Sequence, residues 1–305
     1  MRPHVRSALD PHPGSATSLD GRRVVITGAA RGIGEALARR LTSRGARVAL
    51  VGLEPERLAE VASELDAPWW ECDVGDMAQV DRAVDSAADA FGGLDVVVAN
   101  AGVAAQLPLV GGDPRIMEQT LRVNVLGAYY TARAGGRHVG HPGGYAVLVS
   151  SLAAAVHVPL LGAYSASKAA VEALGNTLRQ EVRGTGARVG VAYFAELDTE
   201  MTSRGFGTEA ARSFLRGRAL TRVTPLSVGV DALERGICRR SRVIAAPWYV
   251  RPLLPTRRAA QTVVEVVSRK GVAMAVEIAR DETVDLTTPQ PSTTRVEADR
   301  SLPEC

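Results

Sequence analysis

Lysine is almost absent from this chain. Lysine and arginine together number 36 in 305 residues, but only Lys168 and Lys270 are lysines. Arginine cannot readily give up its proton and is broader than an ammonium, so a lysine here marks a place for a compact group whose pKa can shift. Lys168 follows Tyr164 by four residues, and this pair is the first candidate for chemistry.

Cysteine and aromatic residues are also scarce. The three cysteines, Cys72, Cys238 and Cys305, are odd in number and lack metal-ligand spacing, so we expect a reducing cytoplasm, no disulfide framework and no metal site. Aromatic residues make up 4% of the chain, but 46% of it is apolar, and the net charge is only +3. That composition can bury the core of one large α/β domain, and it does not indicate nucleic-acid binding.

Charge is missing from residues 143–167, which contain no Asp, Glu, Lys or Arg. Such a run suggests a transmembrane helix, but Ser150, His157, Pro159 and several glycines interrupt it. We therefore expect a buried strand followed by an active-site loop, and no transmembrane segment. Residues 1–20 have no apolar h-region like that of a signal peptide and are predicted to be a flexible leader.

Short β-branched runs alternate with helical patterns through most of the chain. Strands are expected at 23–27, 47–51, 69–73, 94–98, 145–150 and 187–193, and helices at 35–43, 55–65, 77–91, 114–134 and 163–183. This alternation predicts an α/β fold with a doubly wound parallel sheet over residues 21–250. We see no internal repeat and no second core.

A glycine-rich turn follows the first strand. Residues 28–34 read Gly-Ala-Ala-Arg-Gly-Ile-Gly and lead into the first helix. Glycines let the backbone approach a pyrophosphate, and the helix N-terminus supplies N–H groups and a positive dipole. The spacing is G-x-x-x-G-x-G rather than G-x-G-x-x-G, but the order of strand, turn and helix predicts dinucleotide binding.

Tyr164 and Lys168 open the predicted helix 163–183, where residues four apart share one face. An ammonium beside a phenol favours the phenolate, which would let the tyrosine act as a general acid or base near neutral pH. The same spacing also describes a surface pair on a helix. The rest of the sequence has to decide between these two interpretations.

Several ordered motifs over residues 23–199 together resemble the short-chain dehydrogenase/reductase family of single-domain, NAD(P)-dependent oxidoreductases. They are Thr27–Gly34, Asp73-Val74, Asn100-Ala101-Gly102, Asn124, Ser151 and Tyr164-x-x-x-Lys168. Ser151 lies thirteen residues before Tyr164, the usual interval in the family. The resemblance implies a Rossmann-type catalytic domain that acts on CH–OH groups of small molecules, and it allows a homodimer or homotetramer.

The resemblance also implies a role for each matching residue. Tyr164 would exchange a proton with the substrate oxygen, and Lys168 would lower the pKa of the phenol and bind the nicotinamide ribose. Ser151 would hold the substrate oxygen, and Asn124 would fix a local kink and a water on the proton path. Taken singly, Ser151 also fits a strand-terminal hydroxyl and Asn124 an ordinary helix residue. The implied cofactor-binding residues are Thr27, Gly28, Arg31, Gly32, Ile33, Gly34, Gly52, Asp73, Val74, Asn100, Ala101, Gly102, Tyr164, Lys168, Leu197 and Thr199.

The choice of cofactor depends on the end of the second strand. NAD-specific relatives often carry an acidic residue there, but this chain has Gly52-Leu53, with Glu54 just beyond. Arg31 could pair with the 2′-phosphate of NADP(H), or it could be a solvated residue at a helix start. Glu54 would favour NAD(H) if it reached the ribose. On balance, NADP(H) is weakly preferred over NAD(H).

The chain departs from the family pattern after the predicted strand 187–193. Phe194-Ala195 stands where the family has Pro-Gly, although Leu197 and Thr199 still match. The family's final strand with its Asp-Gly-Gly ending is missing, and residues 242–249 stand in its place. The backbone at the substrate entrance is therefore expected to differ from that of the family.

The C-terminal part of the chain lies outside the resemblance. Residues 251–282 are predicted to form a basic helical extension, with a helix within 256–280 whose apolar side covers the substrate entrance. The basic side could contact a membrane surface or a partner, or it could simply be solvated. Residues 283–305 are predicted to be a disordered tail.

The expected pocket is mainly apolar. Its borders are 104–107, 152–161 and a lid at 200–216, which predicts an uncharged, mainly apolar alcohol, ketone or aldehyde as substrate. One alternative is a catalytically inactive NADP-binding regulatory protein of the same fold, although the complete Asn, Ser, Tyr and Lys set argues against it. A sugar-nucleotide epimerase is disfavoured by the glycine spacing and by the lack of a sizeable C-terminal substrate domain.

Overall fold

A parallel sheet forms the centre of the molecule. The computed structural model describes residues 18–205, 208–214, 223–269, 271–282, 284–288 and 290. Seven strands lie in the order β3-β2-β1-β4-β5-β6-β7. They are β1 (Arg23–Thr27), β2 (Arg47–Gly52), β3 (Trp69–Glu71), β4 (Val96–Ala99), β5 (Tyr145–Val149), β6 (Arg188–Phe194) and β7 (Val243–Ala246). The strand order reverses between β1 and β4, which confirms the predicted doubly wound parallel sheet.

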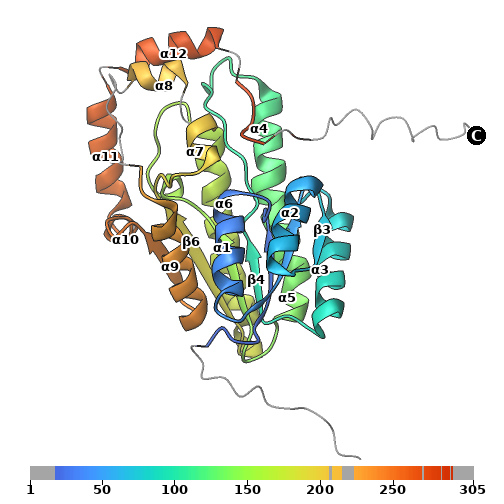
Figure 1. The fold of residues 1–305 in the computed structure, drawn as a ribbon. Coiled ribbons are helices and arrows are strands. Elements are labelled where there is room, and N and C mark those ends of the chain that lie inside the picture. The colour runs from blue at the N-terminus through green and yellow to red at the C-terminus, as the bar shows by residue number, and fades with distance from the viewer. Residues whose placement is uncertain are drawn as a thin grey trace, which may run out of the picture.

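Helices flank the sheet (Figure 1). Those up to β6 are α1 (Gly32–Thr42), α2 (Pro55–Leu65), α3 (Met77–Phe91), α4 (Pro114–Leu121), α5 (Gly127–His138) and α6 (Gly162–Glu181), with the short turns η2 (Leu152–Ala154) and η3 (Val182–Thr185). Those after β6 are α7 (Glu200–Gly205), α8 (Glu209–Phe214), α9 (Leu226–Arg239), α10 (Val250–Leu253), α11 (Arg257–Ser268) and α12 (Val272–Asp281).

The apolar strands bury side chains on both faces of the sheet, as strands of a parallel sheet do. One core layer contains Leu37 of α1 and Leu233 of α9. The other contains Val84 of α3 and Ala132 of α5. Leu19 belongs to the first layer, although the domain was expected to start at residue 21. The rest of the predicted leader, residues 1–17, lies outside the described residues.

The predicted helix 114–134 is one helical rod with an irregular middle. Between α4 and α5, residues Arg122–Leu126 (η1) form a turn of π-helix. The hydrophobic pattern runs through such a turn without interruption, so it gave no sign of the irregularity. The wider turn lies at Asn124, whose side chain is buried.

Two elements late in the chain, helix α9 and strand β7, were not expected. Helix α9 packs on α1, and β7 pairs with β6 in parallel. The family's final strand is therefore present here, and only its Asp-Gly-Gly ending is missing. Its residues, Val243-Ile244-Ala245-Ala246, are a short apolar run like those of the other strands.

The C-terminal extension consists of two helices rather than one. The helical pattern is interrupted between Ser268 and Val272, so α11 and α12 run in different directions (Figure 1). Helix α12 packs on α8, and Ala275 and Ala279 form a small apolar cluster with Ala210 and Leu160. The extension therefore supports the part of the chain that was predicted to be a lid.

The predicted tail is partly ordered. Most of residues 283–305 lie outside the described residues, but Thr287 is buried. Its hydroxyl accepts a hydrogen bond from the Ala104 N–H (3.2 Å), and its own N–H donates to the Ala104 carbonyl (3.2 Å). The segment 284–288 thus differs from the expected disorder, because backbone pairing and the apolar side chain of Leu286 hold it to the domain.

In the part of the chain that the structure describes, no helix is both long and apolar enough to cross a membrane. The uncharged run 143–167 instead forms β5, the turn η2 and the first part of α6.

Candidate active site

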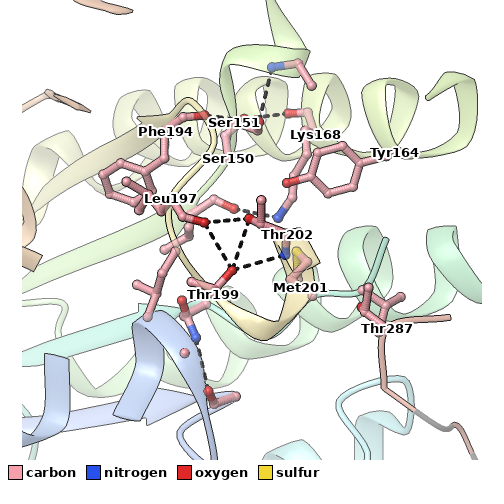
Figure 2. A pocket seen from close by; sticks show the side chains of 18 of the residues that line it. Ser150, Ser151, Tyr164, Lys168, Phe194, Leu197, Thr199, Met201, Thr202 and Thr287 are labelled. Atoms are coloured by element: carbon pink, nitrogen blue, oxygen red, sulfur yellow. Dashed lines mark hydrogen bonds between the residues drawn. The ribbon is translucent and has the colours of Figure 1, made fainter. Parts of the chain in front are cut away.

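A cavity of about 720 Å³ opens at the carboxyl ends of the strands. One end is formed by the β1–α1 turn and the end of β2, and the middle by Ser151, Tyr164 and Lys168. The far end is walled by the C-terminal extension, and α7 lies along the cavity from the β1–α1 turn. Figure 2 shows the middle of the cavity, with Tyr164 and Lys168 on α6. Thr199 and Met201 face them from the segment that follows β6.

The predicted site residues gather in this cavity. Three of them, Thr27, Gly34 and Asn124, do not line it, and each supports residues that do. The others that line it are Gly28, Arg31, Gly32, Ile33, Gly52, Asp73, Val74, Asn100, Ala101, Gly102, Ser151, Tyr164, Lys168, Leu197 and Thr199.

The glycine-rich turn fits the dinucleotide that the sequence predicted. Gly28 has a φ of +67°, and a Cβ there would lie 2.7 Å from the Cα of Ala101. A Cβ on Gly34 would lie 2.1 Å from the Gly28 carbonyl oxygen. Only glycine allows this close approach of backbone to backbone, which leaves the start of α1 open to a pyrophosphate.

Asn100 ties the ends of β1 and β4 together. Its side-chain amide donates to the carbonyls of Thr27 (3.0 Å) and Gly28 (3.2 Å). Its backbone N–H donates to the Thr27 hydroxyl (3.1 Å), which in turn donates to the Val98 carbonyl (3.3 Å). Thr27 and Asn100 therefore fix the glycine turn at the point where the strand order reverses.

Tyr164, Lys168 and Ser151 lie together at the centre of the cavity (Figure 2). Tyr164 and Lys168 are 8% and 4% exposed. The Lys168 ammonium donates to the Val149 carbonyl (3.0 Å) and lies 5.6 Å from the centre of the Tyr164 ring. The Ser151 hydroxyl donates to the Phe194 carbonyl (3.2 Å). The interpretation of Tyr164 and Lys168 as an exposed surface pair is therefore wrong.

Asn124 supports this group from the π-helical turn. Its Oδ1 accepts from the Val103 N–H (2.8 Å), and its Nδ2 donates to the Val103 carbonyl and to the Ser167 hydroxyl (both 2.9 Å). A Cβ on Gly102 would lie 3.2 Å from Asn124 Oδ1 and 3.3 Å from Lys168 Nζ. Gly102 thus allows the Asn124 and Lys168 side chains to approach each other.

Burial governs both titrating groups. It raises the pKa of Tyr164, while a hydrogen bond with Ser151 acts in the opposite direction. Burial also lowers the pKa of Lys168 to about 8. The sequence predicted that the ammonium would lower the pKa of the phenol, but in the structure burial outweighs any such effect. Tyr164 is therefore protonated at neutral pH and able to donate its proton.

Replacing Lys168 with methionine is expected to stabilise the cofactor-free protein by about 1–3 kcal/mol at pH 7. The folded protein releases the Lys168 proton near pH 8, against 10.5 for an ordinary lysine. Below pH 8 the fold must bury a charge, and this cost disappears as the pH rises from about 8 to 10.5. The advantage of the variant in urea unfolding should shrink over that window. An advantage that is independent of pH would contradict the lowered pKa.

Arg31 lies at the end of the cavity where the sequence placed the adenosine ribose. Its guanidinium makes two hydrogen bonds to the carboxylate of Glu54, one of them 2.7 Å long from Nε, and a third to Glu200 (2.6 Å). Arg31 is therefore not a solvated helix-start residue. Asp73 is held at the cavity wall by Arg122 (2.6 Å).

The segment after β6 takes an ordered path although it lacks Pro-Gly. Leu197 is buried and bridges to Thr224, and a Cβ on Gly32 would lie 3.8 Å from Thr199. The Thr202 hydroxyl donates to the Leu197 carbonyl (2.5 Å) and its N–H donates to the Thr199 hydroxyl (3.3 Å). These bonds, drawn in Figure 2, hold the start of α7 to the segment after β6, and Thr199 of that segment lies beside the glycine turn.

The remaining lining residues were only partly anticipated. Leu152, Val156, Val158 and Met201 line the cavity as expected, whereas His157 and the predicted border 104–107 do not. Phe206 lies outside the described residues, as do the side chains of Arg204, Arg212 and Phe214. Glu200 and Thr202 belong to the predicted lid and Ala260 to the helix predicted within 256–280, whereas the sequence did not identify Tyr249, Thr287 and Gln290. In the predicted tail, the alternating apolar residues Val284 and Leu286 were the one sign in the sequence that residues 284–288 pack against the domain.

Comparisons with known proteins identify the family of this chain. The family model for short chain dehydrogenases matches residues 22–214. D-threitol dehydrogenase of Mycolicibacterium smegmatis is 33% identical over 68% of this chain and 80% of its own length. The 11-beta-hydroxysteroid dehydrogenase 1A of Arabidopsis thaliana is 32% identical over 76% of this chain and 70% of its own length.

Solved structures share the fold. A short-chain dehydrogenase/reductase from Burkholderia phymatum in complex with NAD has a TM-score of 0.70 and 25% identity, covering 82% of this chain and 96% of its own. A short chain dehydrogenase from Burkholderia cenocepacia in complex with NADP has a TM-score of 0.67 and 29% identity, covering 74% and 96%. With the glycine turn and the Ser, Tyr and Lys group in one cavity, these matches mean that the chain belongs to the short-chain dehydrogenase/reductase family of oxidoreductases.

Proposed function

We propose that this protein transfers a hydride between NAD(P)(H) and an uncharged, mainly apolar alcohol or carbonyl compound, with Tyr164 as general acid and base. The observation that carries the proposal is the position of Tyr164, Ser151 and Lys168 between the glycine turn and an apolar wall, all in one cavity. The bound nicotinamide would accept or supply the hydride. The turn that includes Gly28, Gly32 and Gly34 would hold its pyrophosphate, and Asn100 would keep that turn in place.

The proposed proton transfer depends on Tyr164 being protonated at neutral pH. In carbonyl reduction, the protonated phenol donates its proton to the substrate oxygen as negative charge develops there, and in alcohol oxidation it takes that proton back. Ser151 would turn its hydroxyl from the Phe194 carbonyl toward the same oxygen and donate a second hydrogen bond to it. Lys168, held by the Val149 carbonyl, supplies the nearby positive charge when the phenolate forms.

The substrate end of the cavity supports an apolar ligand. Its walls include Leu152, Val156, Leu253, Ala260 and Val264. A cavity with this lining and a few hydroxyl groups binds apolar molecules and orients them through one polar atom. The names of the relatives include both a polar and an apolar compound: D-threitol is a polyol, whereas 11-beta-hydroxysteroids are largely apolar.

An absorbance screen with NAD(H) and NADP(H) tests the proposal. The panel contains aliphatic, terpenoid, steroid and sugar-type alcohols and carbonyl compounds. We expect turnover with apolar compounds and little with sugars or acidic metabolites. Preference for a polyol or an acid over every apolar compound would overturn the substrate class. Binding of the cofactor without turnover of any compound would favour the inactive regulatory protein of the same fold.

For the cofactor we propose a weak preference for NADP(H). Gly52 carries no carboxylate at the last position of β2, and Arg31 lines the same cavity. Arg31 is shared with Glu54, so a 2′-phosphate has to compete for it, which keeps the preference small.

Replacing Arg31 with alanine should therefore weaken NADPH binding more than NADH binding, by up to about tenfold. The loss removes the partner of the phosphate and also leaves the carboxylates of Glu54 and Glu200 facing it. Dissociation constants from titration calorimetry measure both effects. Equal losses for the two cofactors would contradict the preference.

A further inference from the structure

The carboxylate of Glu200 lies between two guanidinium groups at the ribose end of the cavity. One of its oxygens accepts from Arg31 (2.6 Å) and the other from Arg57 (3.1 Å). Glu200 is the first residue of α7, whereas Arg57 belongs to the first turn of α2. The ion pairs therefore connect α7, in the predicted lid, to the glycine turn through Arg31 and to α2 through Arg57.

The surroundings of Glu200 are those of a phosphate site. Two guanidinium groups converge on it, and guanidinium groups bind phosphate through several hydrogen bonds. Helix α2 adds the positive end of its dipole, and its N-cap residue Glu54 makes no capping hydrogen bond because its carboxylate turns to Arg31. The anions present at this corner are carboxylates of the protein itself, those of Glu200 and Glu54.

We propose that Glu200 is an internal anion that a nucleotide 2′-phosphate displaces from Arg31 and Arg57, releasing the start of α7. This inference rests on the proposed function, because it requires that the cavity bind NAD(P)(H). A nucleotide with a 2′-hydroxyl offers no competing anion and leaves the two ion pairs in place. Glu200 is thus a specificity-determining residue that opposes NADP(H) and leaves NAD(H) binding unchanged.

Displacement of Glu200 would also affect the substrate end of the cavity. The next residues of α7, Met201 and Thr202, line the cavity, and Thr202 is bonded to Leu197 and Thr199 (Figure 2). Once the ion pairs to Arg31 and Arg57 are lost, the first turn of α7 is held by fewer bonds. Binding of the 2′-phosphate at one end would therefore loosen a wall near the other.

The test compares two nucleotides that lack nicotinamide, adenosine 2′,5′-bisphosphate and adenosine 5′-monophosphate, on the full chain and its Glu200→Gln variant. Glutamine keeps the size of the side chain but removes the charge. We expect the variant to bind the bisphosphate about three- to tenfold more tightly and the monophosphate unchanged. The control is Glu64→Gln, which changes net charge equally and breaks an ion pair with Arg39 outside the cavity lining. The control should change neither constant.

Hydrogen exchange of the α7 amides gives a second measurement. NADPH should speed exchange at Met201 and Thr202 in the unaltered chain, whereas NADH should not, and in Glu200→Gln the two cofactors should act alike. Equal gains for both nucleotides, or no gain, would overturn the role of Glu200 while leaving the proposed function intact. Failure of NADH and NADPH alike to bind would instead overturn the proposed function.

Discussion

Replacing Tyr164 with phenylalanine is expected to lower the turnover of a good substrate by about 10²–10⁴-fold, the usual contribution of a positioned acid or base. The change removes one hydroxyl and keeps the ring, which is almost fully buried. Lys168 keeps its bond to the Val149 carbonyl, and the glycine turn is untouched. Binding of the cofactor should therefore stay within about twofold of the original.

Steady-state kinetics and calorimetry measure the two quantities separately. Tyr129→Phe is the matched control, because Tyr129 is 45% exposed on α5 and does not line the cavity. It should change neither turnover nor cofactor affinity. If Tyr164→Phe turned over a good substrate at the original rate, the proposed acid–base role would be wrong.

Removing all residues after Thr256 should raise the KM for apolar substrates by at least about tenfold, with a smaller change in kcat. The deletion takes away Ala260, Val264 and Thr287 from the cavity wall, while Tyr164 and Lys168 remain. It also uncovers Leu160 and Ala210, which α12 buries. We expect Tm to fall by roughly 5–10 °C and solubility to drop.

A shorter deletion that ends the chain after Gln290 is the control, because it leaves every described contact of the extension in place. Melting curves and substrate kinetics of the two shortened proteins can be compared directly. Unchanged melting and kinetics in the longer deletion would show that residues 257–290 contribute nothing to the site.

The elements that the sequence predicted well are those with local signals. Runs such as Arg23–Thr27 carry β-branched residues in nearly every position, and the turn 28–34 carries glycines where backbone atoms meet. Ser151, Tyr164 and Lys168 follow at fixed intervals on consecutive elements of a known fold. Each signal lies within a few residues, so the positions around the cavity could be assigned before their contacts were known.

The parts that could not be predicted depend on residues far apart in the chain. Arg31 looked like a phosphate ligand, but its pairing with Glu54 and Glu200 joins three separate elements. The composition of 283–305 predicted disorder, because an average over the segment hides Leu286 and Thr287. The pKa of Tyr164 was expected to fall beside an ammonium, yet it rises because the whole fold buries it.

The division of the cavity between two parts of the chain bears on how such a protein could change its substrate. The residues proposed to transfer the proton and the glycine turn all lie within residues 22–214, the part that matches the family. Ala260, Val263, Val264, Thr287 and Gln290 come from beyond it. Variation confined to α11 and the segment after α12 could redirect the protein to new molecules without altering Ser151, Tyr164 or Lys168. A combinatorial library limited to those positions is therefore a practical starting point for directed evolution.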